Sequence, residues 1–138
     1  MDKKTRKELK KEYQQTHPPM GVYQIRNMVN KKIYIGTALN LTGVFNGSRA
    51  QLNAGSHMNR ELQSEWRDFG SDKFIFEILD ELTATEGPDH DYRDDLAFLE
   101  EVWLEKEQPY GERGYNQRKK GTEERLRLIA QNRSNRES

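Results

Sequence analysis

Two short segments near the N-terminus have the residue pattern of β-strands. Residues 21–27 alternate apolar and polar side chains, and residues 33–36 place a tyrosine between two isoleucines ahead of a glycine. The connection between them, residues 28–32, contains Asn30, a residue type that tolerates the left-handed backbone conformation. The pattern therefore predicts an antiparallel hairpin.

A third strand is predicted further along the chain. Over residues 73–79, Phe74, Phe76 and Ile78 occupy alternate positions, which places them on one face of a strand. The segment after it, residues 83–91, contains a Gly-Pro pair and several polar turn formers, which predicts a loop.

Helical spacing of apolar residues predicts helices elsewhere, over residues 2–15, 41–52, 59–69, from 94 to a point before 109, and over 123–130. The helix over 59–69 is the best marked, because Asn59 can cap its start and Gly70 can end it. The helix over 41–52 is the least favourable, since Gly43 and Gly47 each cost a helix interior about 1 kcal/mol relative to alanine.

Charges are segregated along a chain whose net charge is zero. Residues 1–19 carry a net charge of +3, residues 80–108 carry −9 and residues 112–138 carry +4. Basic ends around an acidic stretch can contact nucleic acid, because phosphate binding depends on local rather than total charge. The alternative interpretation is that these runs are the solvated faces of helices.

Composition narrows the chemistry further. The 138 residues fit one domain, and hydrophobic and charged residues each make up 33%, which predicts a small core under a highly charged surface. The absence of cysteine excludes disulfides, thiolate nucleophiles and cysteine-type zinc sites. No apolar run approaches the ~18 residues needed to cross a bilayer. We therefore expect a soluble cytoplasmic protein that does not contact a membrane.

The predicted hairpin carries two short motifs, Gly21-Val22-Tyr23, which resembles a "GIY" element, and Tyr34-Ile35-Gly36, a "YIG" element. After them come, in order, Gly55-Ser56-His57, Leu62-Gln63, Trp66, Phe74–Leu79, Glu100 with Trp103 three residues later, and Gly114-Tyr115-Asn116. On these residues the chain resembles the GIY-YIG nuclease family over residues 20–117. The resemblance is greatest to its homing-endonuclease and phage-type branch, without the separate DNA-binding module of that branch. Residues 1–19 are then a basic helical extension, and residues 118–138 a basic C-terminal helix and tail.

The resemblance implies a fold and a set of site residues. The fold is expected to be α+β and sandwich-like, with a small three-stranded antiparallel sheet flanked by helices and a phosphodiesterase site across one face of the sheet. The family's site residues correspond here to Tyr23, Tyr34, Glu100 and Asn116, and His57 matches a histidine found in some members. Glu100 is expected to bind Mg²⁺ or Mn²⁺, and the expected partner is DNA, contacted through its backbone.

These residue types suit the hydrolysis of a phosphodiester, which needs a base for water, a positive charge for the transferring phosphate and a proton for the leaving oxygen. A tyrosine with a pKa of ~10 is a poor base in water, but a neighbouring cation makes it usable. One carboxylate, such as that of Glu100, is enough to hold one Mg²⁺ that keeps several waters. The amide of Asn116 is expected to orient its neighbours.

Each of these residues also has a purely structural interpretation. Tyr23 and Tyr34 fit a cross-strand aromatic pair that stabilises the sheet. Glu100 fits a solvated acidic helix face, Asn116 fits a turn, and His57 fits the entry to a helix. The residue types alone do not decide between the two interpretations.

One position departs from the family pattern. The family arginine is expected ten residues after Tyr34, where this chain has Val44, and Ser48 occupies a second position that often holds histidine or tyrosine. Arg49 is the nearest basic residue, but on a regular helix it points about 140° away from position 44. Three functions therefore stay open. We favour a divalent-metal-dependent endonuclease in which Arg49 supplies the positive charge of the missing family arginine. The alternatives are a catalytically impaired relative that binds nucleic acid or protein, and a small structural or regulatory domain.

Overall fold

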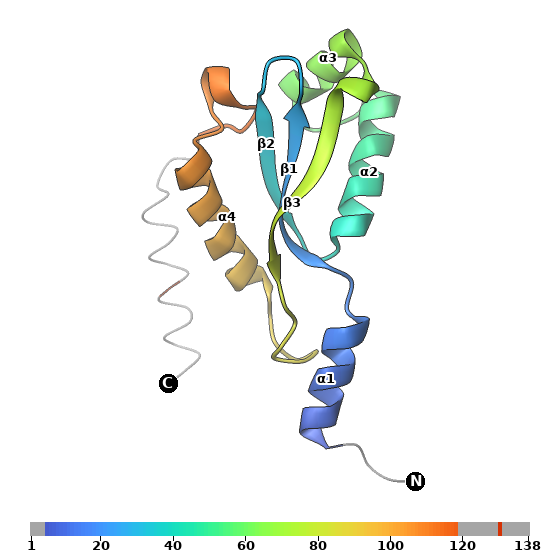
Figure 1. Ribbon diagram of the computed structural model, residues 1–138, viewed down its shortest axis with the longest axis vertical. Helices are drawn as coiled ribbons and strands as arrows, with labels where there is room; N and C mark the ends of the chain where they lie inside the picture. Colours follow the sequence, from blue (N-terminus) through green and yellow to red (C-terminus); the bar gives the residue numbers. More distant parts are fainter. Residues whose placement is uncertain (1–4, 119–129, 131–138) are drawn as a thin grey trace.

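The computed structural model describes residues 5–118 and residue 130. A three-stranded antiparallel sheet lies at its centre in the order β2-β1-β3, with helices on both faces (Figure 1). The elements along the chain are α1 (Arg6–Thr16), β1 (Met20–Asn27), β2 (Ile33–Ala38), α2 (Leu41–Ala54), α3 (Arg60–Phe69), the short 3₁₀ helix η1 (Ser71–Lys73), β3 (Phe74–Leu82), α4 (Arg93–Glu107) and the 3₁₀ helix η2 (Gly111–Arg113). The predicted α+β class and helix-flanked antiparallel sheet are confirmed. The helix predicted over residues 123–130 lies outside the described residues, except for Ala130.

The pairing of β1 with β3 confirms the predicted alternation and adds a bulge. Phe74, Phe76 and Ile78 pair in turn with every second residue of β1, so they share one face of the sheet. The next pair joins Asp80 to Val22, which leaves Leu79 as an extra residue in β3. The bulge lies where β3 passes the "GIY" motif.

Two asparagine side chains hold the turn between β1 and β2. The side-chain oxygen of Asn27 accepts a hydrogen bond from the amide of Val29 at 2.9 Å, and that of Asn30 accepts one from the amide of Lys32 at 3.0 Å. The residue in the left-handed conformation is Lys31, with φ 67°, and the expectation that Asn30 takes this role is wrong. Asn30 stabilises the turn with its side chain, as in an Asx turn.

Helix α2 forms over its full predicted span despite its glycines. Asn40 caps it by accepting a hydrogen bond from the amide of Gly43, and Gly55 ends it in the left-handed conformation with φ 77°. Leu41 and Leu52 lie on the inner side of the helix and are almost fully buried. A cap contributes about 1 kcal/mol and each buried leucine about 1.5–3 kcal/mol, which outweighs the cost of about 1 kcal/mol for each interior glycine.

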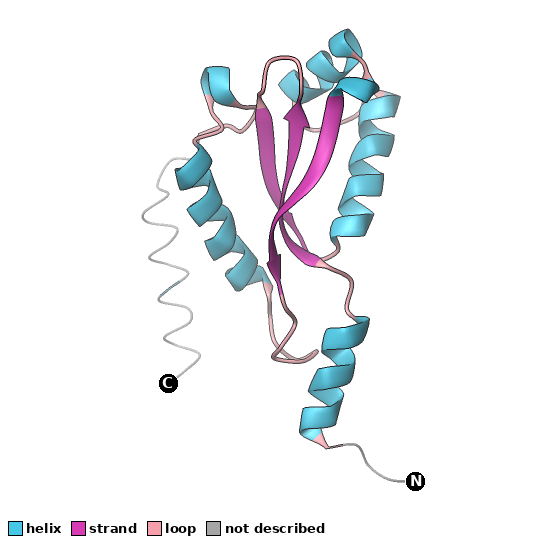
Figure 2. Ribbon diagram, viewed as in Figure 1, coloured by secondary structure: helices cyan, strands magenta, loops and turns pink. Residues whose placement is uncertain are grey.

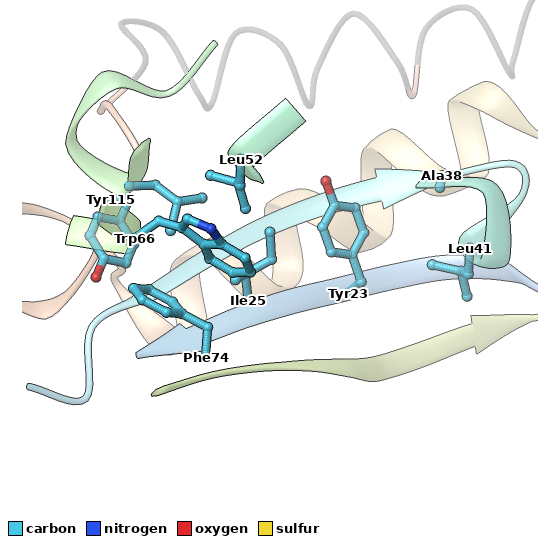
Figure 3. Packing of buried hydrophobic residues seen from close by; sticks show 9 residues of the cluster. Tyr23, Ile25, Ala38, Leu41, Leu52, Trp66, Phe74 and Tyr115 are labelled. Carbon is cyan, nitrogen blue, oxygen red and sulfur yellow. The ribbon is translucent and has the colours of Figure 1, made fainter. Parts of the chain in front are cut away.

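Helices α2 and α3 lie on one side of the sheet, and α4 lies on the other (Figures 1 and 2). The main core lies between the sheet and the first pair of helices, and is formed by Tyr23, Ile25, Ala38, Leu41, Leu52, Leu62, Trp66, Phe74 and Tyr115 (Figure 3). A second cluster, built around Val22, Ile35 and Leu104, joins α4 to the opposite face. The edge strand β2 is thus accessible to side chains from both layers.

Helix α1 packs at the far end of the sheet. The ring of Tyr13 stacks on that of Tyr92 with a centroid separation of 6.5 Å, beside the buried Met20 and Ala84. Within the described part of the chain, no helix has both the length and the apolar character needed to span a membrane.

Candidate active site

The two motif tyrosines stand on neighbouring strands of the face covered by α2 and α3. Tyr23 on β1 is 6% exposed and Tyr34 on β2 is half-buried, and their ring centroids lie 6.4 Å apart. The edge of the Phe45 ring from α2 closes over Tyr23 at a centroid distance of 5.7 Å. Tyr23 projects from β1 between Ile25 and Leu41 (Figure 3). The tyrosines therefore form the aromatic pair that a structural role requires, and they also line a cleft described below.

The glycines of the two motifs make room for this arrangement. Gly36 pairs with Tyr23 across the strands, and a Cβ at Gly36 would lie 2.7 Å from the Tyr23 hydroxyl oxygen. At Gly21, a Cβ would lie 1.9 Å from the carbonyl oxygen of Asp80 in β3. The lack of a side chain at Gly36 lets the Tyr23 ring lie on β2, and the lack of one at Gly21 lets β3 approach β1.

Glu100 reaches the same region from the opposite layer. It lies on α4, which packs against β2, and its Oε2 accepts a hydrogen bond from the Thr37 hydroxyl at 3.4 Å. Thr37 follows the motif glycine on β2, so the contact places the carboxylate at the strand that carries Tyr34. Glu100 and the tyrosines come from three different elements and converge on β2.

Both tyrosines are held in the protonated form. Burial raises the pKa of Tyr23 above its usual value, and the neighbouring Tyr34 and the Glu100 carboxylate raise it further. Burial, followed by the Glu100 carboxylate, also raises the pKa of Tyr34. A tyrosine whose pKa is raised in this way donates hydrogen bonds, and it becomes a base only when a positive charge approaches it.

Asn116 fastens the chain after η2 to the outer edge of β2. Its side-chain oxygen accepts a hydrogen bond from the amide of Ile35, and its side-chain nitrogen donates one to the Ile35 carbonyl, both at 2.9 Å. Two residues earlier, Gly114 forms a parallel bridge with Ile33. Both hydrogen-bonding atoms of the Asn116 side chain are therefore used to hold the strand next to Tyr34.

His57 lies at the entry to α3, with 7% of its surface exposed. Its Nδ1 accepts a hydrogen bond from the amide of Asn59 at 3.0 Å, and its ring lies at 90° to that of Tyr34 with centroids 5.9 Å apart. Burial lowers the pKa of His57, although the Asn59 contact partly opposes this shift. The accepting Nδ1 places the proton of the neutral ring on Nε2.

A cleft of about 830 Å³ opens where these elements meet, and its walls include Tyr23, Tyr34, Glu100 and Asn116 together with Arg60 and Arg118. His57 packs behind Tyr34 and is not part of the wall. The cleft thus gathers four of the six candidate residues from β1, β2, α4 and the segment after η2.

The helix that was expected to carry a cation presents apolar side chains here. Val44 is half-buried against the main core, and Ser48 is 8% exposed. Arg49 is exposed on α2, and its guanidinium carbon lies 4.4 Å from the centroid of the Phe76 ring. It is not among the residues that line the cleft, because α2 stays a regular helix and carries Arg49 away from position 44.

The donor atoms in the cleft suit a loosely bound divalent cation. The described residues contain no group of three or more His, Cys, Asp or Glu side chains placed to hold a metal ion. Mg²⁺ does not need such a cage, because it keeps several waters and binds through one or two carboxylates and substrate phosphates. The acidic residues among the described lining of the cleft are Glu61, which forms an ion pair with Lys32, and Glu100, which is at the position where the family resemblance implies a metal ligand.

No protein-family model and no curated protein matches the chain. The catalytic domain of the homing endonuclease I-TevI is similar in structure, with 27% sequence identity and a TM-score of 0.60, over 72% of this chain and 99% of that domain. The resemblance to the GIY-YIG nuclease family is confirmed. A mutant of the same catalytic domain, described as that of an intron endonuclease, gives 26% identity and a TM-score of 0.57, over 71% of this chain and 92% of that one.

The GIY-YIG resemblance did not point to three residues that the cleft contains or uses. Thr37 anchors Glu100, and Arg60 and Arg118 place positive charge on the wall. Arg118 stands only two residues after Asn116 in the sequence, so its closeness to a motif residue was a signal for it. No comparable signal marks Arg60, which lies in the cleft because α3 begins there.

Proposed function

We propose that this chain is a GIY-YIG endonuclease that hydrolyses DNA phosphodiesters with the help of Mg²⁺ or Mn²⁺. The observation that carries the proposal is the meeting of Tyr23, Tyr34 and Glu100 in one cleft, within a fold similar to a homing endonuclease catalytic domain. A purely structural tyrosine pair does not require a carboxylate from the opposite layer beside it. The arrangement brings together the proton-carrying and acidic groups that phosphodiester hydrolysis uses.

In the proposed mechanism, the Tyr34 hydroxyl loses its proton to solvent when positive charge enters the cleft, and the resulting phenolate takes the proton of the attacking water. The leaving oxygen takes a proton from solvent water. Both tyrosines line the cleft, but Tyr34 is half-buried whereas Tyr23 is 6% exposed, so Tyr34 is better placed for a water to reach. Tyr23 stays protonated and donates a hydrogen bond to the substrate phosphate. Asn116 acts through β2, because its two bonds to Ile35 hold Tyr34 in position.

Glu100 is the proposed metal ligand. A divalent cation held there would supply positive charge that polarises the phosphate and lowers the pKa of nearby hydroxyl groups. The hydrogen bond from Thr37 orients the carboxylate before a metal binds.

Nicking of supercoiled plasmid with Mg²⁺ or Mn²⁺ tests this function. We expect Glu100→Gln and Tyr34→Phe each to lower the rate by at least about 100-fold, since each removes one catalytic group. Glu105→Gln is the matched control, because Glu105 is exposed on the same helix and does not line the cleft. Equal rates for Glu100→Gln and Glu105→Gln would contradict the proposed site, and an inactive wild-type chain would contradict the nuclease function.

A second candidate function is favoured by Val44. With no cation on α2 at that position, the chain would be a catalytically impaired relative that binds nucleic acid through the same cleft. This candidate predicts DNA binding that weakens steeply with salt and with neutralisation of Lys119 and Lys120. It also predicts that the protein does not nick DNA in the presence of Mg²⁺ or Mn²⁺.

A further inference from the structure

Hydrolysis in the cleft requires positive charge at the phosphate, and none of the side chains assigned so far carries one. Negative charge builds on the phosphate oxygens as the water attacks, whereas Tyr23 and Tyr34 are neutral and Glu100 is an acid. Among the described residues that line the cleft, the positively charged side chains are those of Arg60 and Arg118. One of these two is therefore the natural partner for the phosphate.

The course of the backbone directs Arg118 towards the part of the cleft that Glu100 lines. Gly114 bridges to Ile33 in the parallel sense, and Asn116 is bonded to Ile35, so the segment advances along β2 by two residues for every two of the strand. Continued by two more residues, this course brings Arg118 towards Thr37, whose hydroxyl bonds to Glu100. Thr37, Glu100 and Arg118 all line the cleft.

A cation–π contact with Tyr110 orients the exposed Arg118 side chain. Its guanidinium carbon lies 4.4 Å from the centroid of the Tyr110 ring. Burial raises the pKa of Tyr110, Arg118 opposes that shift, and Glu101 and Glu100 add to it, which places the cation and Glu100 within electrostatic reach of one ring. A guanidinium that lies over an aromatic ring makes this contact without using its N–H groups as hydrogen-bond donors, so they are left for bidentate contact with phosphate.

The other arginines fit the role less well. Arg60 begins α3 and, like Arg118, is exposed, but it forms no ion pair and no ring contact with any residue that the structure describes. Arg49 stacks on Phe76 outside the cleft. Only a group that is already oriented stabilises the developing charge without reorganisation, which favours Arg118.

We propose that Arg118 is a catalytic residue of this chain, and that its guanidinium binds the phosphate under attack and stabilises the charge that develops on it. The inference rests on the proposed nuclease function. It assigns the cation to the segment after Asn116 and not to α2.

Steady-state nicking by the full chain tests the assignment. We expect Arg118→Ala to lower kcat by about 10²–10³-fold with a much smaller change in KM, because the interaction strengthens as charge develops. Added guanidinium ion at non-denaturing concentration is expected to restore part of the lost kcat. Arg118→Lys should recover only part of the rate, since an ammonium cannot make the bidentate contact.

Arg67→Ala is the matched control, because Arg67 is exposed near the end of α3 and does not line the cleft. A wild-type kcat for Arg118→Ala, in a protein that Glu100→Gln inactivates, would overturn the role of Arg118 and leave the nuclease function standing. A loss that guanidinium does not restore, accompanied by a lower melting temperature, would likewise overturn it in favour of a structural role. An inactive wild-type chain would overturn both proposals.

Discussion

Gly36 is the residue whose substitution most directly tests how the fold positions the site. Its cross-strand partner is Tyr23, and an added Cβ would lie 2.7 Å from the Tyr23 hydroxyl oxygen, 2.8 Å from Cζ and 2.9 Å from Cε1. Carbon atoms in good contact are about 3.5–4.0 Å apart, so Gly36→Ala requires the ring to move by about half an ångström or more. The Phe45 edge at 5.7 Å lies against the same ring and resists that movement.

The expected cost has two parts. Overpacking of a buried ring typically lowers the free energy of unfolding by about 1–3 kcal/mol. The Tyr23 hydroxyl also moves away from the proposed phosphate position, and a misplacement of about 1 Å costs on the order of 100-fold in rate. We therefore expect Gly36→Ala to lower both stability and kcat, with the larger proportional loss in kcat.

Urea denaturation and plasmid nicking measure the two parts separately. The matched control is Gly47→Ala in α2, where an added Cβ meets nothing within 4 Å and the helix should gain up to about 1 kcal/mol. In a double-mutant cycle, Tyr23→Ala should remove most of the destabilisation caused by Gly36→Ala, because the clashing atoms are gone. Purely additive effects, or a Gly36→Ala protein as stable and active as the wild type, would refute the steric argument.

Two further predictions concern the supports of the site. Asn116→Ala removes both bonds to Ile35 and should lower the free energy of unfolding by about 1–3 kcal/mol, together with the nicking rate. Asn46→Ala on the exposed side of α2 should leave the rate unchanged and raise stability by at most about half a kcal/mol; equal urea midpoints for the two variants would contradict the clamp. Burial lowers the pKa of His57 below 6.5, so the stability it contributes is present above pH 6.5 and is lost as the pH falls through its lowered pKa. Unfolding measured from pH 5 to 7.5 should therefore show a shallower acid loss in His57→Gln than in the wild type or in His17→Gln, and identical slopes would rule this out.

Much of the fold was predictable because its signals are local. Asn59 and Gly70 bound α3 as expected, since a cap and a stop act within one turn of the residues that carry them. The hairpin followed from the two motifs and their spacing. The bulge at Leu79 was not predictable in the same way, because an extra residue in β3 shows only against the register of its partner.

The motif residues of the candidate site were predictable from the sequence, whereas the residue that supplies its positive charge was not. Tyr23, Tyr34, Glu100 and Asn116 meet in the cleft, as the family pattern implied. Arg49 was chosen for its sequence distance to Val44, whereas the structure places its side chain over Phe76 and outside the cleft. The position of Arg118 depends on the contact between Asn116 and Ile35. These residues are 81 positions apart, and no local sequence pattern reveals such a contact.

Two different elements reach the edge strand β2, so either can carry a cationic side chain to the site. Tyr34 stands on β2, Gly36 receives the Tyr23 ring, Ile35 holds the Asn116 segment and Thr37 holds Glu100. Helix α2 reaches this strand from one layer, and the segment after η2 reaches it along the free edge. On the proposed assignment, Val44 adds to the apolar core and the charge comes from the second route. A charge supplied by the edge segment depends on the Asn116 clamp and not on the packing of α2, so loss of the clamp should reduce catalysis even where α2 is intact.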